Sequence, residues 1–384
     1  MNGIRLKNRT LFIPLAVTIL VMAGCSSDSP TSSAPEPTDP YSVILTIAGT
    51  GTAGLGADGG APTEVHFYLP QDLTFGPDGI PYILDWNNHR VRILKDNKVT
   101  TVIGTGMLGD APAGLAREVS LNHPTHISFD PLGRLILSAW HNSMVMRMDL
   151  GTTFIQPICG DGRRSFGGDG GPAGQAILDL PSSTAFDSKG QMYISDQANQ
   201  RIRLVDVNGV ITTAVGTGQA GFAGDGGPAS EAKISLPGSQ SAPPVGRIFV
   251  DDQDNLYISD TVNNRIRKVD ANGVITTVAG SNRQGFDGDG GLATEAALNW
   301  PSDVAIGPDG NLYIADTRNS VIRMVDQNGI ITTFAGKGRE PGYEGDGGLP
   351  AEAKLNRPYG ITFDARGNFY IADTHNHVVR MIPN

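Results

Sequence analysis

The sequence is poor in cysteine, charged residues and aromatic residues. Only two cysteines, Cys25 and Cys159, occur among 384 residues, so a disulfide framework is excluded and the fold has to rest on packing. Charged residues make up 18% and aromatic residues 7% of the chain, which instead contains 50 glycines. This balance indicates many tight turns rather than long, salt-bridged helices. It favours an all-β protein.

Positive charge is also scarce. The 39 acidic residues outnumber the 29 lysines and arginines and leave a formal net charge of -10. A protein that binds nucleic acid needs a basic face that replaces the counterions of the phosphates. We therefore expect no nucleic-acid partner.

The first residues have the features of an export signal. Arg5, Lys7 and Arg9 precede an apolar run over 11–23, which is too short to span a bilayer. The run ends in Met-Ala-Gly-Cys at Cys25 and resembles the lipobox of bacterial lipoproteins, in which cleavage leaves the cysteine lipidated at the new N-terminus. The alternative is an ordinary secretory signal with a chance cysteine.

The lipobox resemblance implies an exported chain that a lipid on Cys25 anchors to a membrane. Serine follows this cysteine, which in Gram-negative lipoproteins implies the outer membrane, with the domain facing either the periplasm or the outside. The sequence then divides into a signal peptide at 1–24, a Ser/Pro-rich tether at 25–41 and a folded domain at 42–384. Loss of the signal removes three positive charges and no negative ones, so the formal charge becomes -13.

One unit recurs six times in the folded domain. Its Tyr-Ile-x-Asp phrase falls at Asp85, Ala139, Asp196, Asp260, Asp316 and Asp373. Each unit contains four short alternating strands, which in the fifth unit are predicted at Asp303–Ile306, Leu312–Asp316, Val321–Val325 and Ile330–Ala335. Four antiparallel strands per unit predict an all-β, six-bladed β-propeller.

The recurring Asp, the Asn three residues later and the Arg seven residues later resemble the NHL repeat over about residues 42–384. The Gly-Asp-Gly-Gly linkers look most like bacterial NHL proteins and the NHL region of teneurins. The sixth unit lacks its fourth strand, whereas residues 43–49 match one. We therefore expect the N-terminal strand to complete the last blade and close the ring. An insertion at 238–245 is expected to protrude as a loop.

Most of the recurring polar residues have a structural interpretation. In the second unit the Asp and the Arg are lost together, as Ala139 and Met146. Joint loss predicts that the two side chains form an ion pair across a hairpin, with ligand binding as the alternative. The predicted pairs are Asp85–Arg92, Asp196–Arg203, Asp260–Arg267, Asp316–Arg323 and Asp373–Arg380.

Two further features are assigned to structure. The Gly-Asp-Gly-Gly linkers lack the additional acidic ligands of a calcium loop, so we expect turns in which the Asp caps the backbone. Cys159 aligns with Ala279 in a fourth strand, which favours a small buried residue over a nucleophile.

The seven histidines fall in the turns and junctions of units six, one and two, which are consecutive in a closed ring. Because histidine, tryptophan and tyrosine side chains stack and hydrogen-bond, we predict a binding surface in this sector, with solvated loop histidines as the alternative. The candidate binding residues are Trp86, His89, His123, His126, Trp140, His141, Tyr359, His375 and His377.

A second hypothesis places chemistry in the central channel. The candidates at its mouth are Asp72, His126, Asp303 and Tyr359, at the starts of first strands. The propeller fold resembles peptidylglycine amidating lyase and the calcium-dependent lactonases, which implies zinc or calcium in the channel under this hypothesis. We expect Asp72 and Asp303 to be too far apart to share an ion without a third ligand.

We favour binding over catalysis, because no catalytic residue set of those enzymes matches in order, and we expect no cofactor. The predicted function is that of a cell-envelope lipoprotein that presents a non-catalytic NHL propeller to a protein, peptide or glycan. The alternative is a metal-dependent lyase or lactonase-like hydrolase that acts in the central channel.

Overall fold

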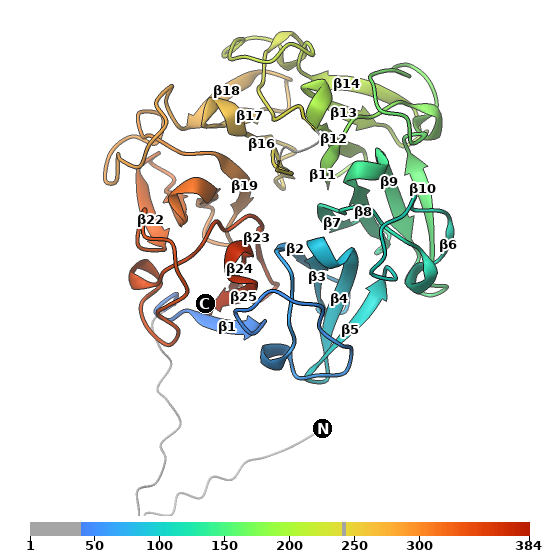
Figure 1. Cartoon of the computed structure of the whole chain (residues 1–384). Helices are drawn as coiled ribbons and strands as arrows, with labels where there is room; N and C mark the ends of the chain where they lie inside the picture. The colour runs from blue at the N-terminus through green and yellow to red at the C-terminus, as the bar shows by residue number, and fades with distance from the viewer. Residues whose placement is uncertain (1–39, 240–242) are drawn as a thin grey trace, which may run out of the picture. The chain divides into compact units, whose positions relative to one another are not determined.

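The computed structural model describes residues 40–239 and 243–384, which form a ring of six β-sheets (Figure 1). The predicted six-bladed, all-β propeller is confirmed. The predicted signal peptide, residues 25–39 of the predicted tether and residues 240–242 of the predicted loop lie outside the described residues. Within the described ranges, no helix is long and apolar enough to cross a membrane.

Each blade is an antiparallel sheet whose first strand faces the centre of the ring. Blade one consists of β2 (Pro70–Phe75), β3 (Pro81–Asp85), β4 (Arg90–Lys95) and β5 (Lys98–Ile103). Blade two consists of β7 (His126–Phe129), β8 (Leu135–Ala139), β9 (Met144–Met148) and β10 (Phe154–Cys159), with β6 (Gly114–Leu115) as a short extra outer strand. Blade three consists of β11 (Pro181–Phe186), β12 (Met192–Asp196), β13 (Arg201–Val205) and β14 (Ile211–Val215).

The remaining three blades follow the same order. Blade four consists of β15 (Ile248–Val250), β16 (Leu256–Asp260), β17 (Arg265–Val269) and β18 (Ile275–Ala279). Blade five consists of β19 (Pro301–Ile306), β20 (Leu312–Asp316), β21 (Val321–Val325) and β22 (Ile331–Ala335). Blade six consists of β23 (Ile361–Phe363), β24 (Phe369–Asp373), β25 (Val378–Ile382) and β1 (Leu45–Ala48).

Single turns of 3-10 helix connect these strands. One turn joins the second and third strands of each blade: η2 (Trp86–Asn88), η4 (Trp140–Asn142), η6 (Gln197–Asn199), η8 (Thr261–Asn263), η9 (Thr317–Asn319) and η11 (Thr374–Asn376). Others precede the blades: η1 (Pro62–Glu64), η3 (Ala116–Glu118), η5 (Ala173–Gln175), η7 (Ala229–Glu231) and η10 (Pro350–Glu352). We call the side of the ring that carries the six turns between second and third strands the loop face.

The N-terminal strand closes the ring as predicted. β1 pairs antiparallel with β25, with Leu45 opposite Met381 and Ala48 opposite Val379. Ile44, just before the strand, is fully buried. The N–H of Tyr41, at the end of the predicted tether, donates to the Pro383 carbonyl at 2.8 Å. This pairing protects the outer edge of β25.

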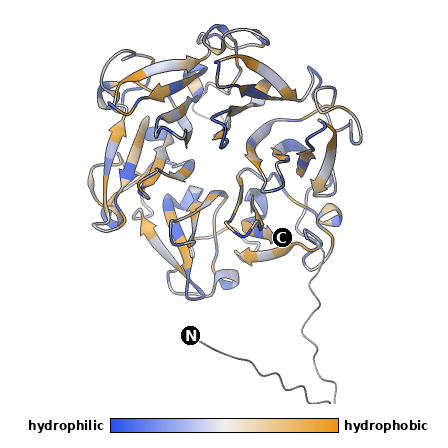
Figure 2. Ribbon diagram, turned by 180° about the vertical axis from the view of Figure 1, so that it is seen from behind, coloured by the Kyte–Doolittle hydropathy of each residue, from blue (hydrophilic) through white to orange (hydrophobic). Residues whose placement is uncertain are grey.

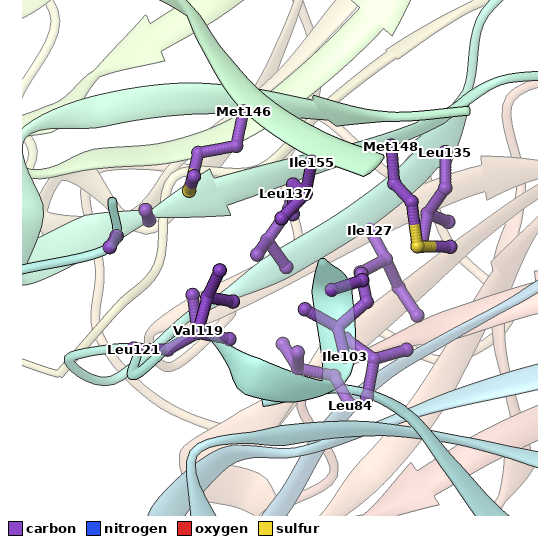
Figure 3. Close-up of a cluster of buried hydrophobic side chains, with 14 of the residues drawn as sticks. Leu84, Ile103, Val119, Leu121, Ile127, Leu135, Leu137, Met146, Met148 and Ile155 are labelled. Atoms are coloured by element: carbon purple, nitrogen blue, oxygen red, sulfur yellow. The ribbon is translucent and has the colours of Figure 1, made fainter. Parts of the chain in front are cut away.

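Hydrophobic residues lie along the strands of every blade (Figure 2) and pack into clusters between neighbouring blades. Leu84 and Ile103 of blade one meet Leu137, Met146 and Ile155 of blade two in one such cluster (Figure 3). Met146 stands at the repeat position that carries Arg in the other five blades. Blade two therefore replaces a polar contact by apolar packing.

The five predicted Asp–Arg pairs are found with nitrogen to oxygen distances of 3.1–4.0 Å. Each arginine also contacts a linker carboxylate at 2.5–3.2 Å, from Asp58, Asp169, Asp225, Asp289 or Asp346. From the sequence we had expected the linker aspartates to cap the backbone. In the structure they do more than this. They bind the guanidinium of the blade that follows, and Thr213 Oγ1 also donates to Asp169.

The end of the predicted loop at 238–245 does not protrude. Val245 is fully buried, and its N–H donates to Gln197 Oε1 at 3.2 Å. This part of the insertion packs against blade three and leads directly into the first strand of blade four.

Candidate functional site

One residue from each blade forms a ring across the central channel. These residues stand at the start of the first strand, thirteen positions before the recurring Asp or its replacement. We call the set Asp72, His126, Ser183, Arg247, Asp303 and Gly360 the channel ring. It contains two carboxylates, one guanidinium and one imidazole.

Arg247 spans the channel from blade four. Its side chain is almost fully buried, and Nη1 donates to Asp72 Oδ1 at 2.7 Å and to Asp303 Oδ2 at 3.2 Å. Its Nη2 donates to the carbonyl oxygens of Gln71 at 2.7 Å and Thr125 at 2.9 Å. The guanidinium thus ties blade four to blades one, two and five.

Gly360 of blade six leaves the room that this guanidinium needs. A Cβ atom at position 360 would lie 2.6 Å from Arg247 Nη1 and 2.9 Å from Asp72 Oδ1. Asp72, His126 and Asp303 bound one end of a cavity of about 340 Å³, whose walls are the first strands. The channel ring closes this cavity at the end nearer the loop face.

Arg247 bridges the two channel carboxylates. Asp72 and Asp303 were expected to lie too far apart to share an ion without a third ligand, and in the structure both contact the same nitrogen atom of Arg247. Their other oxygens accept backbone N–H groups of Ile127 at 2.8 Å and Val304 at 2.8 Å. Every oxygen of the two carboxylates therefore already accepts a hydrogen bond.

Burial dominates the electrostatics of the channel ring. It raises the pKa values of Asp72 and Asp303, although Arg247 opposes the shift. Burial alone would lower the pKa of Arg247, but the two carboxylates outweigh it and raise this pKa. Burial, followed by repulsion from Arg247, lowers the pKa of His126 to about 3. The imidazole is therefore neutral, and its Nδ1 accepts the Thr184 N–H at 3.3 Å.

Replacing His126 by asparagine is expected to make the fold less sensitive to acid. Unfolded histidine gains a proton near pH 6.5, whereas folded His126 gains one only near pH 3. The contribution of His126 to stability is thus complete above about pH 6.5 and falls by about 1.4 kcal/mol per pH unit below it. The asparagine side chain would retain an acceptor for the Thr184 N–H without a titrating group.

Urea unfolding of the parent and of His126→Asn between about pH 7 and pH 4.5 measures this effect. The stability advantage of the parent should shrink as the pH falls. His66→Asn is the control, because it makes the same replacement at an exposed histidine outside the channel. An advantage that stays constant over this range would contradict the assignment.

Tyr359, the fourth residue predicted for the channel mouth, lies outside this cluster. It is buried, and its ring stacks against His375 with centroids 6.4 Å apart. Burial raises the pKa of its hydroxyl. Tyr359 therefore belongs to the packing between blades five and six.

Blades one and two differ from the others at the first residue of the turn on the loop face. In blades three to six the side chain of this residue donates a hydrogen bond of 2.7 Å to a proline carbonyl at the junction with the next blade. These donors are Gln197, Thr261, Thr317 and Thr374. In blades one and two it is Trp86 and Trp140. The Nε1 atoms of both indoles have no hydrogen-bond partner among the described residues.

The two indoles and three imidazoles form one continuous cluster at the junction of blades one and two. The ring of His123 lies 4.4 Å from that of His89, 4.9 Å from Trp86 and 5.0 Å from His141, between centroids. Trp140 stacks on His141 at 4.1 Å. We call Trp86, His89, His123, Trp140 and His141 the aromatic patch.

Two of the candidate histidines have a structural role at the blade junctions. His89 Nδ1 accepts the N–H of His123 at 3.3 Å, and His377 Nδ1 accepts the N–H of Leu69 at 3.1 Å. Gln200 and Asn264 make the same contact in blades three and four. These imidazoles therefore join adjacent blades, as the amides do elsewhere in the ring.

The remaining histidines are separated from the aromatic patch. His375 stacks with Tyr359, and His377 packs on Tyr68 with centroids 5.8 Å apart. His66 is exposed and contacts Thr50. The sector predicted from the sequence thus divides into the aromatic patch, the Tyr68–His377 pair between blades six and one, the Tyr359–His375 pair between blades five and six, and His126 in the channel.

Two histidines of the aromatic patch, His89 and His123, are poor bases. Burial, followed by repulsion from His89 and His141, lowers the pKa of His123 to about 4. Burial also lowers the pKa of His89. In the described part of the chain, no three His, Cys, Asp or Glu side chains converge on a possible metal position.

Cys159 is buried, and burial raises the pKa of its thiol to about 12. A thiol in this environment is an unreactive core residue.

Sequence reasoning missed Arg247 and the asparagines of blade two. The insertion at 238–245 hides the register of Arg247, although counting back from Asp260 would have found it. Asn142 Oδ1 accepts the Asn122 N–H at 3.0 Å. In the other blades the recurring Asp accepts this N–H, as Asp196 does from Asp179 at 2.8 Å, so Asn142 substitutes for the carboxylate that blade two lacks.

Six sheets in NHL register, closed by the N-terminal strand, define this molecule as an NHL-type six-bladed propeller. A crystal structure of an auxiliary nutrient binding protein from Bacteroides ovatus has a similar fold, with a TM-score of 0.65 and 20% identity. The match covers 89% of this chain and 76% of that chain.

Comparison with known families places the chain more closely. The family described as Teneurin NHL domain matches residues 41–223 and 283–344, which is more than half of the chain, and the protein belongs to this family. It is 26% identical to Teneurin-m of Drosophila melanogaster over 353 residues, and 25% identical to Teneurin-1 of Mus musculus over 375 residues. These matches cover 84% and 88% of this chain but only 12% and 13% of the two teneurins.

Proposed function

We propose that the protein is an exported lipoprotein, anchored through Cys25, that presents the aromatic patch as a non-catalytic binding surface. Its ligand would be a protein, peptide or glycan of the cell envelope. The signal and tether predicted at 1–24 and 25–41 support the anchoring, and Ser26 supports an outer-membrane location. The acidic net charge speaks against nucleic acid as a ligand.

The observation that carries the binding role is the replacement of a junction hydrogen bond by tryptophan in two adjacent blades. No described residue accepts a hydrogen bond from Nε1 of Trp86 or Trp140, a feature that Trp300 shares. The place of the two indoles at the first residue of the turn, rather than the unpaired donor, therefore sets blades one and two apart. Trp140 is fully buried and stacks on His141, so Trp86, which is half-buried, is the indole whose apolar face suits stacking on a sugar or a peptide side chain. The half-buried rings of His123 and His141 adjoin the two indoles.

The contacts of the channel ring favour binding over catalysis. A metal-dependent lyase or lactonase in the channel would need carboxylate oxygens that can take up an ion. Arg247 and backbone N–H groups already occupy the oxygens of Asp72 and Asp303. The fold alone supplies no chemistry.

Binding of envelope peptides and glycans to the purified chain tests the proposal, with tryptophan fluorescence and calorimetry as readouts. For any ligand found, Trp86→Ala is expected to weaken binding by about 30-fold or more, as for a central aromatic contact. Trp300→Ala is the matched control, because Trp300 lies in blade five and packs on Arg318. A screen without any ligand, or equal losses in the two variants, would contradict the proposal.

A further inference from the structure

Asn122 and two histidines of the aromatic patch bring three possible metal donors together. His123 Nδ1 lies 2.8 Å from Asn122 Oδ1. His141 Nδ1 lies 3.3 Å from Asn122 Oδ1 and 3.3 Å from His123 Nδ1. The three atoms thus form a compact triangle of two imidazole nitrogens and one amide oxygen.

The size of this triangle matches a metal coordination sphere. A circle through the three atoms has a radius of about 1.8 Å. An ion about 1 Å above its plane would therefore lie about 2.1 Å from all three atoms, the usual zinc to nitrogen or oxygen distance. The side chains would not need to approach one another for an ion to bind.

The surrounding contacts hold the donors in place. Backbone hydrogen bonds fix both segments, since the His141 N–H donates to the Asn122 carbonyl at 3.3 Å and the Asn122 N–H donates to Asn142 Oδ1 at 3.0 Å. The His123 N–H donates to His89 Nδ1, and the His141 ring stacks on Trp140. Preorganised donors lose little freedom when they bind an ion.

This combination of residues occurs in one blade. The positions of Asn122, His123 and His141 correspond to Asn356, Arg357 and His375 in blade six, so an arginine there replaces one imidazole. Blade five has Asn299, Trp300 and Arg318, and the other blades lack histidine at both imidazole positions. The blade that lost the repeated Asp–Arg pair is therefore the one that gained the three donors.

We propose that Asn122, His123 and His141 bind a divalent transition-metal ion on the loop face. Two imidazoles and one amide favour zinc, nickel or copper over calcium or magnesium, which prefer oxygen ligands. With three protein donors, the ion keeps at least one position for water or for a donor atom of a ligand. The metal site goes beyond the proposed binding role and does not depend on it.

Metal titration of the full chain, purified without a polyhistidine tag, tests this site. Calorimetry with zinc should give one ion per chain, and cobalt should give visible d–d bands that zinc abolishes. His141→Phe keeps a ring on Trp140 but removes the donor, and it should weaken zinc binding at least tenfold, as the loss of a ligand does. His123→Asn should do the same, because Asn tolerates the positive φ of 49° at this position.

His375→Phe is the matched control, since it removes the imidazole at the same position of blade six and should leave the affinity unchanged. Thermal melting of each variant verifies that it is folded. Absence of zinc, nickel and copper binding by the parent chain would overturn the proposal, as would unchanged binding by folded His141→Phe or equal loss in His375→Phe. Because no organic ligand is present, these results are independent of the peptide and glycan screen.

Discussion

Replacement of Arg247 by Met is expected to lower the free energy of unfolding by about 3–5 kcal/mol at neutral pH, as the loss of one partner from a buried ion cluster does. The variant would leave Asp72 and Asp303 buried without their cation, and the carbonyl oxygens of Gln71 and Thr125 would lose a charged donor. Urea unfolding followed by circular dichroism measures the loss.

Two comparisons separate this effect from a general loss of arginine. Arg163→Met removes a side chain that is 70% exposed and should change stability by no more than about 0.5 kcal/mol. Asp303→Asn in the Arg247→Met background removes one of the uncompensated charges and should restore part of the stability. A loss below about 1 kcal/mol for Arg247→Met would contradict its role as the cation of a buried cluster.

The acid dependence of the Arg247→Met variant gives an independent check. Burial raises the pKa values of Asp72 and Asp303, and removal of Arg247 takes away the interaction that opposes this rise. The folded variant would therefore take up protons more readily than the unfolded chain. Its deficit relative to the parent should be largest above these raised pKa values and should shrink as the pH falls through them.

Deletion of residues 43–49 from the full chain is expected to abolish cooperative thermal unfolding. The deletion removes β1 from blade six, exposes the edge of β25 and withdraws Ile44 and Ala48 from the core. Loss of a buried isoleucine alone costs about 2–5 kcal/mol, and the strand also supplies backbone hydrogen bonds. Together these losses approach the free energy of unfolding of a typical domain, which is about 5–15 kcal/mol.

Near-ultraviolet circular dichroism during heating measures the transition, and size-exclusion chromatography detects association through the exposed edge. Ile44→Ala is the matched control, because it removes core volume but keeps the strand, and it should still unfold cooperatively at a lower temperature. A synthetic peptide of residues 42–50 should partly restore the transition of the deletion variant. A deletion variant that unfolds as cooperatively as Ile44→Ala and at the same temperature would show that β1 does not close the ring.

The sequence determined the blades because their signals are local and repeated. The predicted strands at Leu312–Asp316 and Val321–Val325 coincide with β20 and β21. Alternation along each strand and a turn of fixed length set the register within a blade. Closure of the ring was also predictable, since a missing strand at one end of the chain matched an extra one at the other end.

The sequence located the candidate site only to a sector. It placed histidines and tryptophans in adjacent blades, but it did not show which of them contact one another. His123 and His141 come together within blade two, whereas His126, three residues after His123, turns into the channel. His123 precedes β7 and has a left-handed backbone conformation with a φ of 49°, whereas His126 is the first residue of that strand, so proximity in sequence did not indicate a common site.

Only the tertiary structure decided which charged side chains meet in the channel ring. Asp72 and Arg247 are separated by 175 positions in the chain, and an insertion precedes the arginine. Their contact exists because six blades bring one residue each to the centre and because Gly360 leaves space beside the guanidinium. The repeat pattern describes a single blade, whereas the charge balance at the centre depends on all six blades at once.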